Sequence, residues 1–388
     1  MKVTPSDPIL RPVMPELDVI RGLAILMVVI YHAFYWQNDM HGLTRVQKLF
    51  VYATWTGRMG VNLFFVLSGF LITGLLLQSI QRSDYYRRFY LRRALRIIPA
   101  YYATLLILAI CRQSTWAYLA FSSVYLSNIS PLFGVAMSYP VFWSLAVEEH
   151  FYMVWPMIVR HTTPKRLAIL SVAIIVVSPL LRWLSFIIEA RSGNVFYTFN
   201  NYTWNSADGL ACGALLVIVL RECEENRTKL LLFSCVAIFG AAVMWVACIP
   251  FGILQRQGTP IGAALQITPW NMGFTGLLGL FLLAGTSRWR GLVLWPAFRY
   301  LGRISYGLYL IHLLVFDAYD AVVYRLSSQV HVTSGTFSAL CIRFVVATCG
   351  AVAVAHISRE YYENFFLTLK DRFTPSPEMN DSKAKAIA

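Results

Sequence analysis

The chain alternates long apolar runs with short polar segments over nearly its whole length. A transmembrane helix needs about 20 mostly apolar residues to cross a bilayer core about 30 Å thick. The sequence therefore predicts an all-α, polytopic transmembrane helical bundle of about ten helices. The expected spans are residues 17–36, 59–80, 97–118, 140–159, 167–188, 206–220, 230–250, 270–286, 304–322 and 337–357.

Two of these runs contain ionisable residues that are costly to expose to lipid. Glu148, Glu149 and His150 interrupt the run at 140–159, and Asp208 lies in the run at 206–220. Charged side chains at membrane depth almost always face the interior of the bundle. We therefore expect both helices to be central.

Basic residues are distributed unequally between the two sides of the predicted bundle. With a cytoplasmic N-terminus, 24 of the 33 Lys and Arg residues fall on the same side. The positive-inside rule then places both termini in the cytoplasm, which requires an even number of spans. The predicted domains are an N-terminal cytoplasmic segment at 1–16, a membrane domain at 17–366 and a polar cytoplasmic tail at 367–388, which we expect to be disordered.

The composition excludes several other classes of protein. Hydrophobic residues make up 57% of the chain and charged residues only 13%, which rules out a set of soluble domains. The formal charge of +14 is explained by topology anchors, so we expect no nucleic-acid partner. The seven cysteines stand singly, with no Cys/His cluster at metal spacing, and no metal is predicted. The first apolar run lacks a signal-peptide cleavage site and should remain as a helix.

The first run holds two strongly polar groups, Arg21 and His32, eleven residues apart. Eleven residues turn a helix by about 1100°, so both side chains share one face, about 16 Å apart along the axis. A cation near the cytoplasm and a deeper imidazole suit a ligand such as acyl-CoA, with an anionic head and a reactive group on a long arm. Alternatively, Arg21 is a topology anchor and His32 a structural hydrogen-bond partner. Intramembrane ionisable groups are usually functional, which favours a functional His32.

The segment FWSLAVEEHFY, residues 142–152, supplies a candidate partner for His32. Glu148 is expected about 12 Å from the outer end of its helix, and His32 about 22 Å from the inner end of a core about 30 Å thick. The two residues should therefore lie at similar depth. A carboxylate beside an imidazole fixes its tautomer and supports its action as a general base. The alternative is a structural ion pair between helices.

Arginines are concentrated in the segment before the third run. Most are interpreted as topology anchors and lipid-headgroup contacts. Those nearest the membrane, Arg92, Arg93 and Arg96, are candidates to bind CoA phosphates. Near the C-terminus, GRISYGLYLIH places Arg303 on the cytoplasmic side, as a further donor-binding candidate, and His312 deeper in the helix. His312 is interpreted as structural, with a position at the same cavity as the alternative.

Together these segments resemble acyltransferase family 3, the polytopic O-acyltransferases that modify bacterial surface glycans. The resemblance rests on LDVIRGLAILMVVIYH, GVNLFFVLSGFLI, RRALRIIPAYY, FWSLAVEEHFY and LGRISYGLYLIH, and it extends from Leu17 to about Phe366. It implies a location in the bacterial inner membrane and acetyl-CoA or another acyl-CoA as donor. The implied acceptor is a carbohydrate or glycolipid hydroxyl, such as one of a surface polysaccharide or a lipopolysaccharide. Arg21 and His32 then correspond to the family's essential pair, and Glu148 to its buried carboxylate.

The sequence departs from the family pattern at two places. His150 stands where Gln is common, and the usual Glu-x-Pro-Phe element reads Glu363, Asn364, Phe365, Phe366, without the proline. We expect the missing proline to change how the last helix ends. Some members of the family carry an extracellular serine-hydrolase-like domain that finishes the transfer. We expect none here, so transfer should be completed within the membrane domain.

A proton-coupled transporter is the rival interpretation. His32, Glu148, Asp208 and His312 are all ionisable residues at membrane depth and would suit a proton relay. A transporter is expected to show inverted repeats and helices broken near the midplane, and neither is evident. We therefore expect an enzyme in which His32 acts as general base or transient acyl carrier, Arg21 positions the donor, and Glu148 supports His32.

Overall fold

The computed structural model describes residues 8–11, 13–36, 42–191, 198–252, 259–327 and 336–373. This described part is all-α, and each of the ten predicted runs overlaps a long helix. The prediction for 97–118 extends too far, because the helix there ends at Ile110 and a turn follows. The long helices are α1 (Pro15–Phe34), α3 (Gly60–Ser79), α4 (Tyr85–Ile110), α6 (Phe142–His161), α7 (Pro164–Arg191), α8 (Thr203–Glu222), α9 (Arg227–Cys248), α11 (Thr268–Gly285), α13 (Pro296–Ser327) and α14 (Phe337–Ile357).

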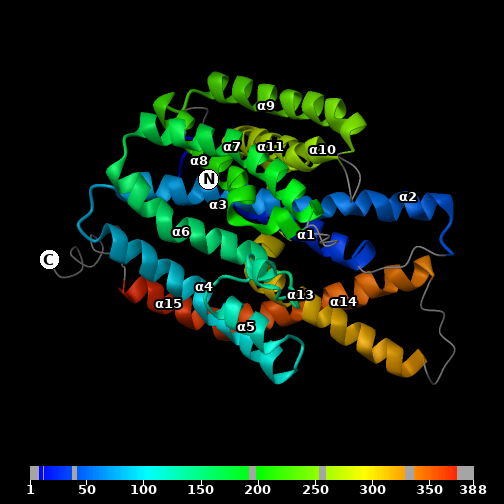
Figure 1. The fold of residues 1–388 in the computed structure, drawn as a ribbon. Helices are drawn as coiled ribbons and strands as arrows, with labels where there is room; N and C mark the ends of the chain where they lie inside the picture. The colour runs from blue at the N-terminus through cyan, green and yellow to red at the C-terminus, as the bar shows by residue number, and fades with distance from the viewer. Residues whose placement is uncertain are drawn as a thin grey trace.

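Nine segments of the described chain are long and apolar enough to cross a membrane. The remaining predicted span, α6, has 20 residues but carries the charges that the sequence placed in the bundle interior. Short helices occupy the connections: α2 (Arg45–Thr54), α5 (Trp116–Ser123), α10 (Pro260–Leu265) and α12 (Arg290–Val293). In Figure 1 the long helices run roughly side by side, with α9 and α11 on one flank, α4 and α15 on the other, and α1 and α3 between them. The cytoplasmic position of the termini stays a prediction.

The C-terminal helix ends later than predicted. After α14 the chain continues through a π-helical turn, Ser358–Glu363, into α15 (Asn364–Phe373). The assignment of 367–373 to a disordered tail is therefore wrong, because these residues extend a helix that packs on α4, where Tyr362 donates a hydrogen bond to the Pro99 carbonyl oxygen. Without the family's proline, nothing removes a backbone donor here. The rest of the predicted tail lies outside the described residues.

Glycines allow the central helices to approach each other closely. A Cβ atom on Gly22 would overlap the Phe298 carbonyl oxygen, and one on Gly302 would overlap that of Asp18, which locks α1 against α13. Gly69 of α3 lies equally close to α8, since a Cβ atom there would overlap the Leu210 carbonyl oxygen. Small residues at such contacts are how transmembrane helices gain packing energy without a hydrophobic driving force.

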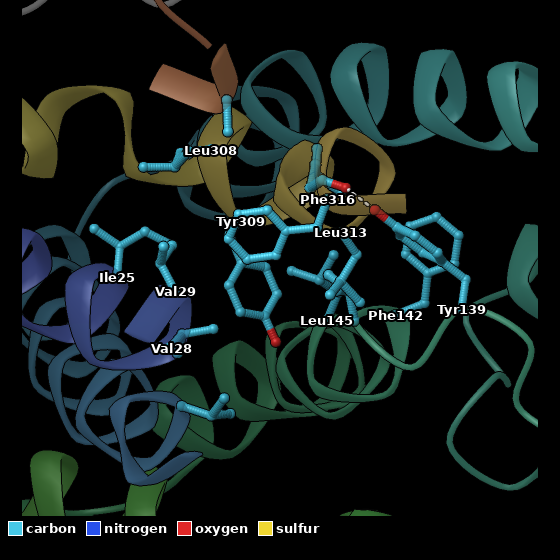
Figure 2. Packing of buried hydrophobic residues seen from close by; sticks show 14 of the residues in the cluster. Ile25, Val28, Val29, Tyr139, Phe142, Leu145, Leu308, Tyr309, Leu313 and Phe316 are labelled. Carbon is cyan, nitrogen blue, oxygen red and sulfur yellow. Dashed lines mark hydrogen bonds between the residues drawn. The ribbon is translucent and has the colours of Figure 1, made fainter. Parts of the chain in front are cut away.

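The largest hydrophobic cluster joins α1, α6 and α13. Figure 2 shows Val28 and Val29 of α1 facing Tyr309 and Leu313 of α13, with Leu145 of α6 beside them. The Tyr139 hydroxyl, just before α6, donates to the Leu310 carbonyl oxygen of α13 at 2.6 Å. This packing fixes the relative position of α1 and α13, the two helices that carry His32 and His312.

A buried ion pair joins α7 to α8. Arg182 and Asp208 are both fully buried, and Nη1 of Arg182 lies 2.9 Å from Oδ2 of Asp208. The other guanidinium donors reach the Ala264 and Asn205 carbonyl oxygens and the Thr268 hydroxyl. Asp208 is thus held in a satisfied structural network and is not paired with the histidines, which removes it from the relay that a transporter would need.

Candidate active site

His32 and His312 form a hydrogen-bonded pair between α1 and α13. Nδ1 of His32 lies 2.9 Å from the Val28 carbonyl oxygen and 3.2 Å from Nε2 of His312. Nδ1 of His312 lies 2.9 Å from the Tyr309 carbonyl oxygen. Carbonyl oxygens only accept, so each Nδ1 carries a proton and Nε2 of His312 accepts from His32. Nε2 of neutral His32 is consequently left with its lone pair, as a general base or nucleophile requires.

An arginine of α14 holds the end of α1 that carries this pair. Arg343 donates to the carbonyl oxygens of His32 and Ala33, at 3.2 and 2.9 Å. Its remaining donors form a bidentate pair with Asp320 of α13, at 2.7 Å each. The last carbonyls of a helix lack intrahelical partners and favour a cation. Arg343 of α14 therefore links α1 to α13, and it does so at the backbone of His32 itself.

A cavity of about 100 Å³ lies between α1, α3, α4, α6 and α13. Its polar lining residues are Arg21, Ser68, Arg93, Arg96, Ser144, Glu148, Glu149, Tyr152, Ser305, Tyr306 and Tyr309. Arg21, Arg93 and Arg96 are the arginines of the cavity wall. The Ser144 and Tyr309 hydroxyls, which lie 2.5 Å apart, belong to another part of that wall.

Tyr309 separates the cavity from the histidine pair. Its ring lines the cavity and lies 5.9 Å, centroid to centroid, from the ring of His312. His32 and His312 themselves do not line the cavity. A ligand arm that enters past the arginines would therefore end at a wall one side chain thick, behind which His32 lies.

The predicted donor-binding arginines divide into two groups. Arg21, Arg93 and Arg96 line the cavity, and Arg21 is also paired with Asp18 at 2.7 Å. Arg92 and Arg303 do not line it, and Arg303 is exposed at the start of α13. These arginines lie within α4 itself, where consecutive side chains point about 100° apart, so Arg93 can line the cavity while its neighbour Arg92 does not.

Glu148 lies in the cavity, but the expectation that it contacts His32 is wrong. Its carboxylate accepts a hydrogen bond from Ser68 at 2.7 Å and has Arg93 and Arg96 as its charged neighbours. Similar depths of Glu148 and His32, as estimated from the sequence, do not imply contact between them, because α6 directs Glu148 toward α3 and α4. His312 instead occupies the position beside His32 that the sequence assigned to a carboxylate. The catalytic role of Glu148 stays a prediction.

A second carboxylate, Glu363, approaches the same region from the π-helical turn. It is buried, accepts from Arg359 at 3.4 Å, and interacts electrostatically with Arg96 of the cavity wall. A Cβ atom on Gly307 would crowd its Oε1 atom, so the bare backbone of α13 makes room for it. The sequence pointed to Glu363 only as part of a helix end.

Comparison with known proteins supports one family. The model of a family described as "Acyltransferase domain" matches residues 14–356. YrhL, a putative peptidoglycan O-acetyltransferase of Bacillus subtilis, is 28% identical over 331 residues, which cover 77% of this chain and 48% of that protein. The peptidoglycan O-acetyltransferase OatA of Listeria monocytogenes is 24% identical over 343 residues, covering 78% and 49%.

A shorter match is with the putative O-acetyltransferase SAS0844 of Staphylococcus aureus, at 31% identity over 168 residues, which cover 37% of this chain and 24% of that protein. The chain thus spans about half of the length, or less, of these relatives. No solved structure matches the chain.

Proposed function

Since the chain belongs to acyltransferase family 3, we propose that it transfers an acetyl group from acetyl-CoA to a hydroxyl of a carbohydrate or glycolipid of the cell envelope. The observation that carries the proposal is the arginine-lined cavity that ends at Tyr309, whose ring packs against His312 of the histidine pair. Acetyl-CoA has anionic phosphates at one end and a thioester at the end of a narrow arm, which matches this order of charge, width and reactive group.

The first step of the proposed reaction is donor binding. Arg21, Arg93 and Arg96 bind phosphate oxygens at the cytoplasmic mouth, where a guanidinium makes short charge-assisted hydrogen bonds. The pantetheine arm fills the cavity toward Tyr309. The nucleotide stays at the mouth, beside the arginines that bind its phosphates.

The second step is transfer to the acceptor. Nε2 of His32 takes the proton of the acceptor hydroxyl, whose oxygen forms a bond to the acetyl carbonyl carbon while the carbon–sulfur bond breaks. The proton passes to the departing CoA thiolate. The Nδ1–H of the transient imidazolium keeps its hydrogen bonds to Val28 and His312 throughout. Transfer through an acetyl group on Nε2 would use the same lone pair, and trapping of acetylated His32 would distinguish the two routes.

Acetyl-CoA turnover by the protein in lipid nanodiscs tests the proposed function. We expect CoA release that depends on an added envelope glycan, together with base-labile acetate on that glycan. Proton flux into vesicles without acetyl-CoA consumption would support the transporter instead, and would contradict the proposal.

Replacement of Arg21 by Ala should weaken CoA binding more than replacement of Arg87. Arg21 lines the cavity, whereas Arg87 lies exposed on α4 and is absent from its lining. A hydrogen bond to a charged group contributes about 1.5–3 kcal/mol, or about 10- to 100-fold in affinity. Titration of the purified variants with CoA checks this order. The reverse order would show that the phosphates bind elsewhere.

Replacement of Glu148 by Gln should raise the KM for acetyl-CoA by about 10-fold, since a charged contact to Arg93 and Arg96 is lost from the cavity wall. The position of the pH profile should not move, because Glu148 is bonded to Ser68 and not to His32. Steady-state kinetics at several pH values measure both quantities. A shifted profile with an unchanged KM would restore the role that the sequence suggested, as the partner of His32.

A further inference from the structure

The outer end of α1 surrounds His32 with aromatic side chains that the donor cavity does not include. The ring of Tyr31 lies 4.9 Å and that of Trp36 lies 5.8 Å from the imidazole, between centroids. Tyr35 stacks on Tyr31 at 5.8 Å. All four side chains keep part of their surface accessible, and none lines the donor cavity. His32 therefore has an accessible side that is separate from the route of the donor.

Arg58 lies beside these rings on the 3-10 turn Trp55–Met59 that precedes α3. This turn is pressed on α1, since a Cβ atom on Gly57 would overlap the Met27 carbonyl oxygen. The Arg58 guanidinium stacks on Trp55, with 4.0 Å from Cζ to the ring centroid, and interacts electrostatically with Tyr31 and Tyr35. The guanidinium is thus held rigidly against the aromatic cluster near His32.

The hydrogen bonds of Arg58 are incomplete. Nη2 donates to the Gln266 side-chain oxygen at 2.7 Å, while the buried Nε–H has no hydrogen-bond partner among the described residues. Within the same part of the chain, no carboxylate forms an ion pair with Arg58, in contrast to the satisfied network around Arg182. Leaving a buried polar group unpaired is costly, and because Arg58 is partly exposed, an anionic ligand could reach the guanidinium and supply the missing partner.

The chemistry of this cluster is that of a carbohydrate site. Trp and Tyr offer flat apolar faces with polar edges, and a guanidinium fork binds a pair of oxygen atoms. We propose that Tyr31, Trp36, Trp55, Arg58 and Gln266 form the acceptor subsite, in which a sugar ring stacks on the aromatic faces and Arg58 binds an anionic oxygen of that sugar. This proposal rests on the proposed function and adds to it that the acceptor is acidic close to the hydroxyl that is acetylated.

The test compares an acidic acceptor with its neutral form. The N-acetylglucosamine–N-acetylmuramic acid disaccharide carries a carboxylate, and its methyl ester differs only by that charge. We expect the wild-type protein to prefer the acid by about 10- to 100-fold in kcat/KM, as a charged hydrogen bond implies. Arg58→Gln should reduce this preference to about one, with CoA affinity unchanged. Arg45→Gln, at an exposed arginine of α2, is the matched control and should keep the preference.

A second variant separates the aromatic contribution from the charge. Trp36→Ala should lower kcat/KM for the acid and the ester equally, since stacking does not depend on the carboxylate. Equal wild-type rates for the two forms, or a preference that survives Arg58→Gln, would overturn the acceptor proposal. CoA binding and envelope-glycan acetylation without turnover of either disaccharide would overturn it as well. Failure to bind CoA would instead overturn the proposed function itself.

Discussion

Replacement of His32 by Ala should reduce acetyl transfer to background while the protein still inserts and folds. General-base catalysis contributes a factor of about 10² to 10⁴, and the proposed step uses the lone pair on Nε2 of His32. The measurements are acetyl-CoA turnover and thermal unfolding of the purified variant. A well-folded His32→Ala protein with normal turnover would disprove the catalytic role, and equal loss of folding and activity would make His32 structural.

His312 supplies the matched comparison for this variant. It acts through His32 as a positioning residue, because its Nε2 atom accepts a hydrogen bond from the Nδ1–H of His32. A glutamine side-chain oxygen at position 312 could accept the same hydrogen bond, whereas a leucine side chain could not. His312→Gln should therefore retain more activity than His312→Leu, with unchanged CoA affinity in both. If the two variants lose activity equally, the orientation of the His32 ring does not depend on this bond.

Replacement of Asp208 by Ala should destabilise the bundle strongly. It leaves the Arg182 guanidinium fully buried without its counter-charge, and breaking one side of a buried ion pair costs about 3–5 kcal/mol. The expected result is a much lower unfolding temperature in detergent, with turnover per folded molecule nearly unchanged. The double replacement of Arg182 by Met and Asp208 by Leu should recover much of the stability, since hydrophobic substitution of a whole pair is often tolerated.

The Asp208→Asn variant distinguishes a fold-stabilising role of Asp208 from the proton relay that a transporter would need. Asp208→Asn preserves shape and some hydrogen bonding, so a fold-stabilising role predicts only partial destabilisation. A proton relay through Asp208 would instead be interrupted in a protein that remains stable. Abolished function at unchanged stability would therefore contradict the structural assignment of this ion pair.

The helices were predictable because bilayer thickness fixes the length of an apolar run, whatever it packs against. Even the charged α6 was located correctly, since its glutamates interrupt an otherwise apolar segment. The same reasoning fails for the limits of α15, whose helical continuation depends on docking against α4. Local sequence shows the polar character of that segment but not the surface on which it packs.

The neighbours of the site residues could not be predicted from the sequence. Residue counting placed Glu148 and His32 at similar depth, yet depth does not tell which neighbour a side chain faces. Arg58 and Arg343 are among the nine basic residues that the charge count leaves on the outer side of the membrane, and the sequence indicated no partner for either. Only the packing shows that Arg343 binds the His32 carbonyl oxygen and that Arg58 stacks on Trp55.

The π-helical turn at Ser358–Glu363 sets the direction in which the side chains of α15 point. Such a turn holds one residue more than an α-helical turn, so the helix absorbs an insertion without a loop. Every side chain beyond it is rotated by about 100° relative to an uninterrupted α-helix. Removal of a single residue from this turn would therefore swing Glu363 or the α15 face away from its partners while leaving the hydrophobic length intact.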